Sequence, residues 1–485
     1  MPDIINEFLA AAPEERVRMA LDAGRAGDLR AYMGEAAFEE YAAVARGAVG
    51  AMDDVSHLGV GAPKNLLFVP GVMGSLLMSQ GYGGMWWIDA RTRHHLNDLR
   101  LDPSGETDAD ENAQVAPITT DPVYEPFMSA VLKRDDFGHV MFAYDWRKSL
   151  RRSAARLRDE ILRLHQGNGG LPIHLVAHSM GGLMVRAALM EHGDEIWPKI
   201  GRIVFVGTPH YGSPAIAGYL KNHFWGFDLM AVLGMYLDRD AYRSMYGVME
   251  LLPAPVGVYP GTDATTPACD HPCANFDMYS AGNWKLDLDA GKTADLQRVL
   301  DSARRFHEDM ERHHQALDQE RRDRMAVIAG VGYKALFRLE YRSGLLGLWE
   351  NMDKECDRIH GNAHRDGDGR VPLASAELHY VGETRYVRGV HGGLTNIPAV
   401  YEDVFRFLNA ESMKLPANPA NALSAHLADS DASEAPHLDG SARADAWSDD
   451  PGYWNEAALP DDALTALDAR LDSDQLPAFN TVRLL

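Results

Sequence analysis

The sequence is poor in two features that would each define a class of protein. It has three cysteines in 485 residues, too few to crosslink a chain of this length, so its stability must come from packing. Positive charge is also scarce, because 47 Lys and Arg residues stand against 70 Asp and Glu residues and give a formal net charge of −23. An acidic surface repels phosphate backbones and anionic lipid headgroups, so we expect neither nucleic-acid binding nor electrostatic docking to a membrane.

Long apolar runs are also missing. No stretch approaches the roughly 18 consecutive apolar residues that a transmembrane helix needs. Asp3 and Glu7 stand where a secretory signal would carry positive charge. We therefore expect a cytoplasmic protein, and the sequence carries no signal for its oligomeric state.

What is present indicates an α/β fold. Apolar residues make up 46% of the chain and charged residues 24%, so most of it can form a buried core. Short continuous apolar runs alternate with stretches of helical periodicity, which is typical of a mostly parallel sheet covered by helices on both faces. The predicted strands lie at Leu66–Val69, Val140–Tyr144, Ile173–Ala177, Ile203–Val206, Ala326–Ala329 and Tyr386–Val387, and two of the helices lie at Ser153–His165 and Gly182–His192.

Changes in composition divide the chain into five parts. Residues 1–55 have amphipathic helical spacing and predict an N-terminal helical extension. The core of the fold occupies residues 62–213 and 325–410, and residues 214–324 between them predict an inserted helical cap or lid whose first half is rich in aromatic residues and Met. Residues 411–485 contain 14 acidic and 4 basic residues, which predicts a flexible acidic tail.

The strongest local signal is a serine between a predicted strand and a predicted helix. Small residues stand two positions before and after Ser179, at Ala177 and Gly181. This pattern predicts a nucleophile elbow, a sharp turn that projects the hydroxyl into a cleft at a helix N-terminus. The elbow motif has Gly at the position of Ala177, and Ala is small enough to replace it. The competing interpretation is an ordinary strand–helix connection with an N-cap serine.

A serine needs a base that is oriented by an acid. In this architecture the acid and then the histidine follow the serine along the chain. Asp368 and His391 have this order and lie on loops that adjoin predicted strands, which makes them the candidate acid and base. Asp366 competes with Asp368 as the acid, and both remain open here.

Acyl transfer also needs two backbone N–H groups that bind the oxyanion. Met180, directly after the nucleophile, is one candidate donor. The other is expected in the glycine-containing loop after the first strand, where we nominate Val72 with Met73 as the close alternative. Trp86 and Trp87 follow this loop and could line an acyl-binding site, although two core tryptophans would fit the sequence equally well.

These motifs together resemble the lecithin:cholesterol acyltransferase-like α/β-hydrolases, a family that includes phospholipases and acyltransferases. The resemblance covers residues 65–405. It implies that Ser179, Asp368 and His391 form a catalytic triad, with Val72 and Met180 as the oxyanion hole. The residues that carry it are Val69-Pro70-Gly71-Val72-Met73-Gly74-Ser75, Tyr144-Asp145-Trp146-Arg147, Ala177-His178-Ser179-Met180-Gly181-Gly182, Gly207-Thr208-Pro209-His210-Tyr211-Gly212-Ser213 and Gly367-Asp368-Gly369 with Val371-Pro372.

The resemblance implies a serine lipase or phospholipase, or an acyltransferase, that cleaves lipid carboxylic esters through an acyl-serine. The alternatives are a soluble carboxylesterase, amidase or peptidase, and a catalytically inactive α/β-hydrolase that binds a ligand or a partner. We expect an ester substrate, no cofactor, and transient contact with a membrane or lipid droplet through the cap. No metal site is expected, because Cys269, His271 and Cys273 fall short of a closed zinc site.

Overall fold

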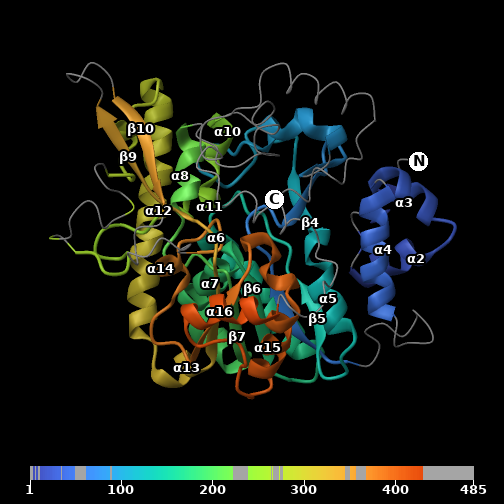
Figure 1. The fold of residues 1–485 in the computed structure, drawn as a ribbon. Helices are drawn as coiled ribbons and strands as arrows, with labels where there is room; N and C mark the ends of the chain where they lie inside the picture. The colour runs from blue at the N-terminus through green and yellow to red at the C-terminus, as the bar shows by residue number, and fades with distance from the viewer. Residues whose placement is uncertain are drawn as a thin grey trace.

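The centre of the structure is a six-stranded parallel sheet with the strand order β11-β8-β7-β6-β1-β5. Its strands β5, β6 and β7 are labelled in Figure 1. This computed structural model describes, apart from short gaps, residues 4–49, 62–221, 239–265, 277–343, 350–356 and 367–429. Every neighbouring pair in this sheet is parallel, which confirms the predicted α/β architecture. The strands are β1 (Lys64–Val69), β5 (Gly138–Met141), β6 (Ile173–His178), β7 (Ile200–Val206), β8 (Met325–Val331) and β11 (Glu383–Arg388).

Both faces of the sheet are buried against helices. Successive residues of a strand alternate between the two faces, and Leu67 and Leu175 lie in one apolar cluster while Leu66 and Val176 lie in another. This is why the strands are continuously apolar rather than alternating. Helices α6 (Leu150–Gly167) and α7 (Met180–Ile196) contribute to the first cluster, and α5 (Glu125–Leu132) and α15 (Pro398–Leu408) contribute to the second.

The strand order reverses at β1. From β1 the chain adds β5 on one side, and after α6 it returns to place β6 on the other side of β1. The carboxyl ends of β1 and β6 therefore face a topological switch point, where open α/β sheets bind their ligands. The glycine loop follows β1 and Ser179 follows β6, so the fold brings the two predicted motifs to this place.

The described residues near the N-terminus include helices α2, α3 and α4, which lie beside a small antiparallel sheet (Figure 1). Their apolar residues share a cluster with Leu76, Met85 and Leu132 of the main body. Arg16 is fully buried and forms an ion pair with Glu125 at an N–O distance of 3.1 Å. The elements are α2 (Pro13–Leu21), α3 (Ala26–Met33), α4 (Glu35–Val49), β2 (Ser75–Ser79), β3 (Met85–Trp87) and β4 (Val115–Thr120), with the sheet order β3-β2-β4.

The regular elements among the described residues between β7 and β8 are helices, which are joined by turns and loops. Helix α12 is the longest of these helices and contacts α7. Whether this stretch acts as a cap or lid remains a prediction. The elements are α8 (Pro214–Lys221), α10 (Arg239–Ser244), α11 (Tyr246–Met249), η6 (Ala281–Trp284), α12 (Ala290–Ala316) and α13 (Gln319–Asp323).

The C-terminal part differs from expectation in two places. After β8, strands β9 (Leu336–Ser343) and β10 (Glu350–Cys356) form an antiparallel pair. The sequence does not predict these strands, because neither is a continuous apolar run. The predicted start of a flexible tail at residue 411 is wrong, because α16 (Pro419–Asp429) is folded against β11 and β8 with Ala422 buried. The N–H of Tyr386 also donates to the carbonyl of Pro416. Residues 430–485 lie outside the described part of the chain.

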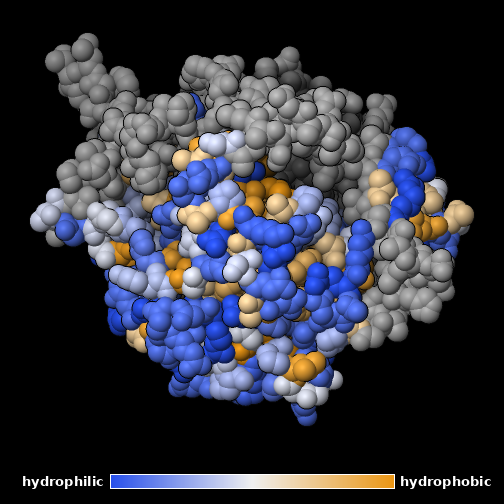
Figure 2. Space-filling view, turned by 60° about the horizontal axis from the view of Figure 1, so that its bottom comes forward, coloured by the Kyte–Doolittle hydropathy of each residue, from blue (hydrophilic) through white to orange (hydrophobic). Residues whose placement is uncertain are grey.

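The face at the bottom of Figure 1 is turned forward in Figure 2, where its coloured residues are mostly hydrophilic with small, separated hydrophobic areas. Within the described ranges, none of the helices combines the length and the apolar character needed to cross a bilayer. The described residues also hold no group of three or more metal-ligating side chains. Cys269, His271 and Cys273 lie outside these ranges.

Candidate active site

Ser179 stands between β6 and α7 in a strained backbone conformation. Its φ is 52° and its ψ is −129°, which a non-glycine residue adopts only where the surrounding structure imposes it. A Cβ on Gly181 would overlap the carbonyl oxygen of Val69, so the close approach of α7 to β1 requires glycine there. The Ser179 side chain makes no capping hydrogen bond to α7, which argues against the N-cap interpretation.

The serine hydroxyl points instead to a histidine from a distant part of the chain. Ser179 Oγ lies 2.8 Å from Nε2 of His391, and Nδ1 of the same ring lies 2.7 Å from Oδ2 of Asp368. The structure thus brings together the three residues that the sequence nominates, in the order serine, imidazole, carboxylate. This order allows a neutral imidazole to accept the serine proton while the carboxylate fixes its tautomer and stabilises the developing positive charge.

The carboxylate of Asp368 is held by its own loop. Its Oδ1 accepts hydrogen bonds from the N–H groups of Arg370 (3.0 Å) and Val371 (2.8 Å), which leaves Oδ2 for the imidazole. The N–H of His391 donates to the carbonyl of Asp368 at 2.9 Å, so the two loops are also joined through the backbone. Asp366, the competing acid, lies outside the described residues.

The loop after β1 lies directly beside the serine. A Cβ on Gly71 would be 2.9 Å from the Cβ of Ser179 and 3.4 Å from its Oγ, so only glycine permits this approach. The N–H of Gly71 donates to Tyr124 Oη and the N–H of Gly74 to the carbonyl of Gly71. These two N–H groups are therefore engaged and are not free to bind an oxyanion.

Between these two glycines, Val72 and Met73 donate no backbone hydrogen bond to any other described residue. Both remain candidates for the oxyanion hole, and Met73 adopts a positive φ of 63°. Met180 is the first residue of α7, so helix geometry provides its N–H with no intrahelical acceptor. An N–H at this end of a helix also lies at the positive pole of the helix dipole.

The structure places Trp86 and Trp87 in the core rather than on an accessible acyl-binding surface. Both side chains are fully buried. The Trp87 indole N–H donates to the carbonyl of Met73 at 2.9 Å, and its ring meets Trp146 edge-on at a centroid distance of 5.0 Å. Trp87 therefore supports the loop that holds the candidate oxyanion donors. Of the two interpretations that the sequence left open, the structure favours core residues.

Two residues of the site received no role from the sequence. Oη of Tyr124 lies 3.0 Å from Nδ1 of His178, and Nε2 of His178 lies 3.0 Å from the carbonyl oxygen of His391. His178 adjoins the nucleophile and is part of the elbow motif, but the motif does not predict which residues its side chain contacts. Tyr124 belongs to no motif, because its contacts depend on how the chain returns across the sheet.

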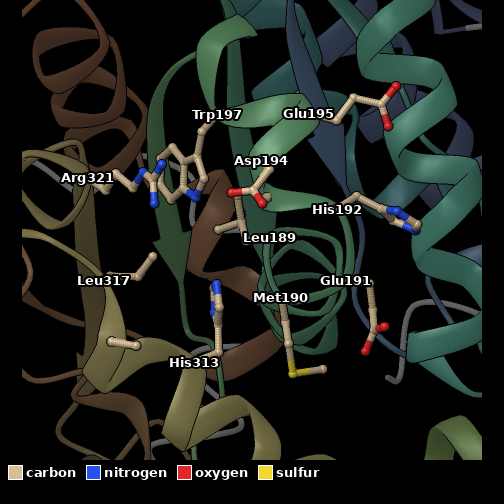
Figure 3. Close-up of a pocket in the computed structure, with 12 residues that line it drawn as sticks. Leu189, Met190, Glu191, His192, Asp194, Glu195, Trp197, His313, Leu317 and Arg321 are labelled. Carbon is tan, nitrogen blue, oxygen red and sulfur yellow. The ribbon is translucent and has the colours of Figure 1, made fainter.

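The site itself is enclosed. Ser179 is 4% exposed and the side chains of Asp368 and His391 are 1% and 16% exposed. A pocket of about 450 Å³ lies elsewhere, between the C-terminal half of α7 and α12, where Trp197 and His313 are among its lining residues (Figure 3). It is at the opposite end of α7 from Ser179, so it does not belong to the candidate active site.

The parallel sheet with helices on both faces, together with a strained serine at a strand–helix turn, defines an α/β-hydrolase fold. The sequence model of the lecithin:cholesterol acyltransferase family matches residues 134–267. This stretch contains Ser179 and Met180, and it excludes Val72, Asp368 and His391. The predicted resemblance is confirmed over this stretch. No curated protein matches the sequence.

Several solved structures are similar at low identity. A chain of the Tle4-Tli4 complex is 16% identical, with 73% of this chain and 100% of that chain covered and a TM-score of 0.47. The mature Bacillus licheniformis lipase BlEst2 is 14% identical, with 72% and 93% covered and a TM-score of 0.33. A product of the gene lin2722 from Listeria innocua is 11% identical, with 73% and 96% covered and a TM-score of 0.30. These scores are too low to support conclusions about this chain, so the fold assignment rests on its own strand order.

Proposed function

We propose that the protein is a serine hydrolase or acyltransferase that cleaves carboxylic esters of lipids. The observation that carries this proposal is the hydrogen-bonded series from Ser179 Oγ through His391 to Asp368, with distances of 2.8 Å and 2.7 Å. A serine on a strained turn, a histidine and a buried carboxylate in this geometry have a well-defined chemical use in acyl transfer.

The reaction proceeds in two stages. In the first, Oγ of Ser179 attacks the ester carbonyl while Nε2 of His391 takes the serine proton, and the imidazolium then gives that proton to the leaving alcohol. The oxyanion of the tetrahedral intermediate is bound by the N–H of Met180 and by the N–H of Val72 or Met73. In the second stage, His391 deprotonates water or an alcohol, which attacks the acyl-serine. The bond to Oγ then breaks, the imidazolium returns the proton to Oγ of Ser179, and an acid or a new ester is released.

The preference for lipid esters is supported by the family match over residues 134–267. In the sequence, the first half of the 214–324 stretch is rich in aromatic residues and Met, which suits apolar acyl chains. The net charge of −23 disfavours anionic membranes, so we expect the substrate at a neutral lipid interface. A soluble carboxylesterase or amidase is the second candidate, since the same three residues serve other acyl groups.

The test is a substrate panel with purified full-length protein. Phospholipids, neutral glycerides and p-nitrophenyl esters of increasing chain length are compared with and without an added alcohol, and Ser179→Ala is the control. We expect faster release of long acyl chains than of C2–C4 chains, and no turnover by the variant. Preference for C2–C4 esters would contradict the lipid assignment, and equal turnover by Ser179→Ala would contradict the serine mechanism.

A further inference from the structure

Three segments around the site are joined by one series of hydrogen bonds. The N–H of Gly71, in the loop after β1, lies 3.0 Å from Oη of Tyr124. The same oxygen lies 3.0 Å from Nδ1 of His178, at the end of β6, and Nε2 of His178 lies 3.0 Å from the carbonyl oxygen of His391. Tyr124 and His178 are each 4% exposed, so solvent does not compete for these bonds.

Only one arrangement of protons satisfies this series. A carbonyl oxygen can only accept, so His178 must carry its proton on Nε2 and donate it to His391. Burial, with the neighbouring His391 as a smaller cause, lowers the pKa of His178 to about 3, and the ring is therefore neutral at physiological pH. Its Nδ1 is then an acceptor, so Tyr124 must donate to Nδ1 and accept from the N–H of Gly71.

The segment that carries Tyr124 also binds, at a second point, the loop Gly71–Gly74, which we call the oxyanion loop. Tyr124 is the last residue of a short 3-10 helix, η3 (Pro122–Tyr124). Asp121, the N-cap residue of this helix, donates its N–H to the carbonyl of Gly74 at 3.0 Å. The segment 121–124 therefore binds the oxyanion loop at Gly71 and at Gly74, on both sides of the two candidate donors. The Tyr124 ring packs on Phe68 of β1 with a centroid distance of 4.9 Å.

We propose that Tyr124 and His178 are positioning residues that hold the oxyanion loop and the backbone of His391 in register with Ser179. This inference rests on the proposed function of the site. The general base and the oxyanion donors come from loops that are distant in sequence, and the tyrosine–histidine pair is a direct polar link between them. Neither residue needs to touch the substrate to affect the rate, because small displacements of reacting groups cost much of the advantage of a fixed geometry.

The first test removes one hydroxyl. In Tyr124→Phe the ring packing is retained, but Gly71 loses its acceptor and Nδ1 of His178 loses its donor. We expect kcat to fall about 10- to 100-fold with KM changed less than about threefold. The matched control is Tyr341→Phe, which removes a buried hydroxyl on β9 that donates to the carbonyl of Trp284. A kcat for Tyr124→Phe equal to that of the control would overturn the proposal.

The second test separates the two nitrogens of His178. The amide of Gln can place a donor near the position of Nε2, whereas the amide of Asn can place a polar atom near Nδ1 but cannot reach His391. We expect His178→Gln to retain more of the wild-type kcat than His178→Asn, because it keeps the bond to the carbonyl of His391. The opposite ranking would show that this bond does not position the base.

The third test does not depend on activity. Spectra of the protein labelled with 15N-histidine, with the His178 signals assigned by their loss in His178→Gln, report which nitrogen carries the proton. We expect the Nε2–H form in the wild type and also in Tyr124→Phe, because the carbonyl of His391 still requires a donor at Nε2. An Nδ1–H form in the wild type would overturn the proposed linkage even if the protein hydrolyses esters. If the wild type turns over no ester and is not labelled by a fluorophosphonate, the proposed function fails, and the tautomer still decides whether the linkage exists.

Discussion

Strands β5 and β6, which are consecutive along the chain, are each followed by a motif of buried polar residues. After β5, Arg147 forms two hydrogen bonds to Asp145 at 2.9 Å and 2.7 Å and donates to the carbonyl of Leu99. Oδ1 of Asp108 lies 2.9 Å from Nη1 of the same guanidinium and forms an ion pair with it. Burial would lower the pKa of Arg147, but the two carboxylates raise it.

After β6, the polar atoms around Ser179 are arranged differently. The hydroxyl is bonded to His391 alone among the side chains, its backbone is strained, and the N–H groups of Val72 and Met73 have no acceptor among the described residues. The Arg147 cluster is closed, because the guanidinium is bound by two carboxylates and a carbonyl of the protein itself. Sequence motifs of similar strength can thus mark a structural cluster or a reactive one, and the difference lies in which donors remain available.

The largest effect is expected when the base of the reactive cluster is removed. In His391→Ala the serine loses its proton acceptor, and we expect kcat to fall by about four orders of magnitude or more. The melting temperature should fall only modestly, because buried Asp368 loses its partner at Oδ2 but keeps two backbone donors at Oδ1. The checks are steady-state ester hydrolysis and thermal unfolding. Turnover within about tenfold of the wild type would show that another group activates Ser179.

A matched pair of substitutions tests the acid. Asp368→Asn should lower kcat by about 10³- to 10⁴-fold, because an amide in this position disfavours the imidazole tautomer that accepts the serine proton. Asp366→Asn should leave kcat close to that of the wild type. Both are measured with the same ester under saturating conditions. A large loss in Asp366→Asn with an active Asp368→Asn would reverse the assignment.

A substitution in the Arg147 cluster should lower the stability of the fold rather than act on the chemistry at Ser179. Arg147→Met removes the buried cation between Asp145 and Asp108, and the part-exposed Lys148, 3.8 Å from Asp145, replaces it only in part. We expect the free energy of unfolding to fall by about 3 kcal/mol. Arg163→Met is the control, because it breaks an exposed pair with Glu160 worth less than about 1 kcal/mol. The measurement is denaturant-induced unfolding of both variants. A loss of unfolding free energy in Arg147→Met as small as that in the control would contradict the contrast between the two regions.

The smallest effect concerns a carboxylate next to the closed cluster. Glu250 accepts hydrogen bonds from Ser149 Oγ (2.6 Å) and from the N–H of Leu150 (2.8 Å) at the start of α6. Burial raises its pKa from 4.5 to about 7, although these hydrogen bonds and two nearby arginines oppose the shift. Between these two values the folded state binds more protons than the unfolded state, so the free energy of unfolding falls as pH rises.

Glu250→Gln should remove this dependence. Relative to the wild type, the variant should gain stability as pH rises from about 4.5 to 7, by roughly 3 kcal/mol at most, and the difference should then level off. Unfolding midpoints of both proteins across this pH range provide the measurement. A difference that does not change with pH would show that Glu250 titrates with an ordinary pKa.

Much of the fold could be predicted from sequence because its strands are buried on both faces. Runs such as Leu66–Val69 and Ile173–Ala177 have no polar face, which favours a parallel sheet over a hairpin. The β9–β10 hairpin could not be predicted in this way. Within the described part of the chain its strands pair only with each other, and they carry mixed polar and apolar residues. Helix α16 also could not be predicted from the sequence, because its Ala-rich segment lies in an acidic stretch and shows little helical periodicity.

The site was predictable where chemistry restricts residue type locally. Ser179 needs small neighbours, so the elbow is visible in the sequence, and chain order then selects Asp368 and His391 as partners. The roles of Trp87 and Tyr124 are not local, because they depend on the side chains reaching Met73 and His178 from other elements. For residues of this kind the sequence supplies composition and order, and only the packed structure supplies the contact.

The most direct test of the account is covalent labelling of the full-length protein with a fluorophosphonate, followed by mass spectrometry of the digested adduct. The probe is attacked by an activated serine and remains attached to it. We predict one phosphonyl group per chain, located on Ser179, and a labelling rate reduced at least as strongly in His391→Ala as in Asp368→Asn. An unlabelled wild-type protein, or an adduct on a different serine, would contradict the assignment of Ser179 as the nucleophile.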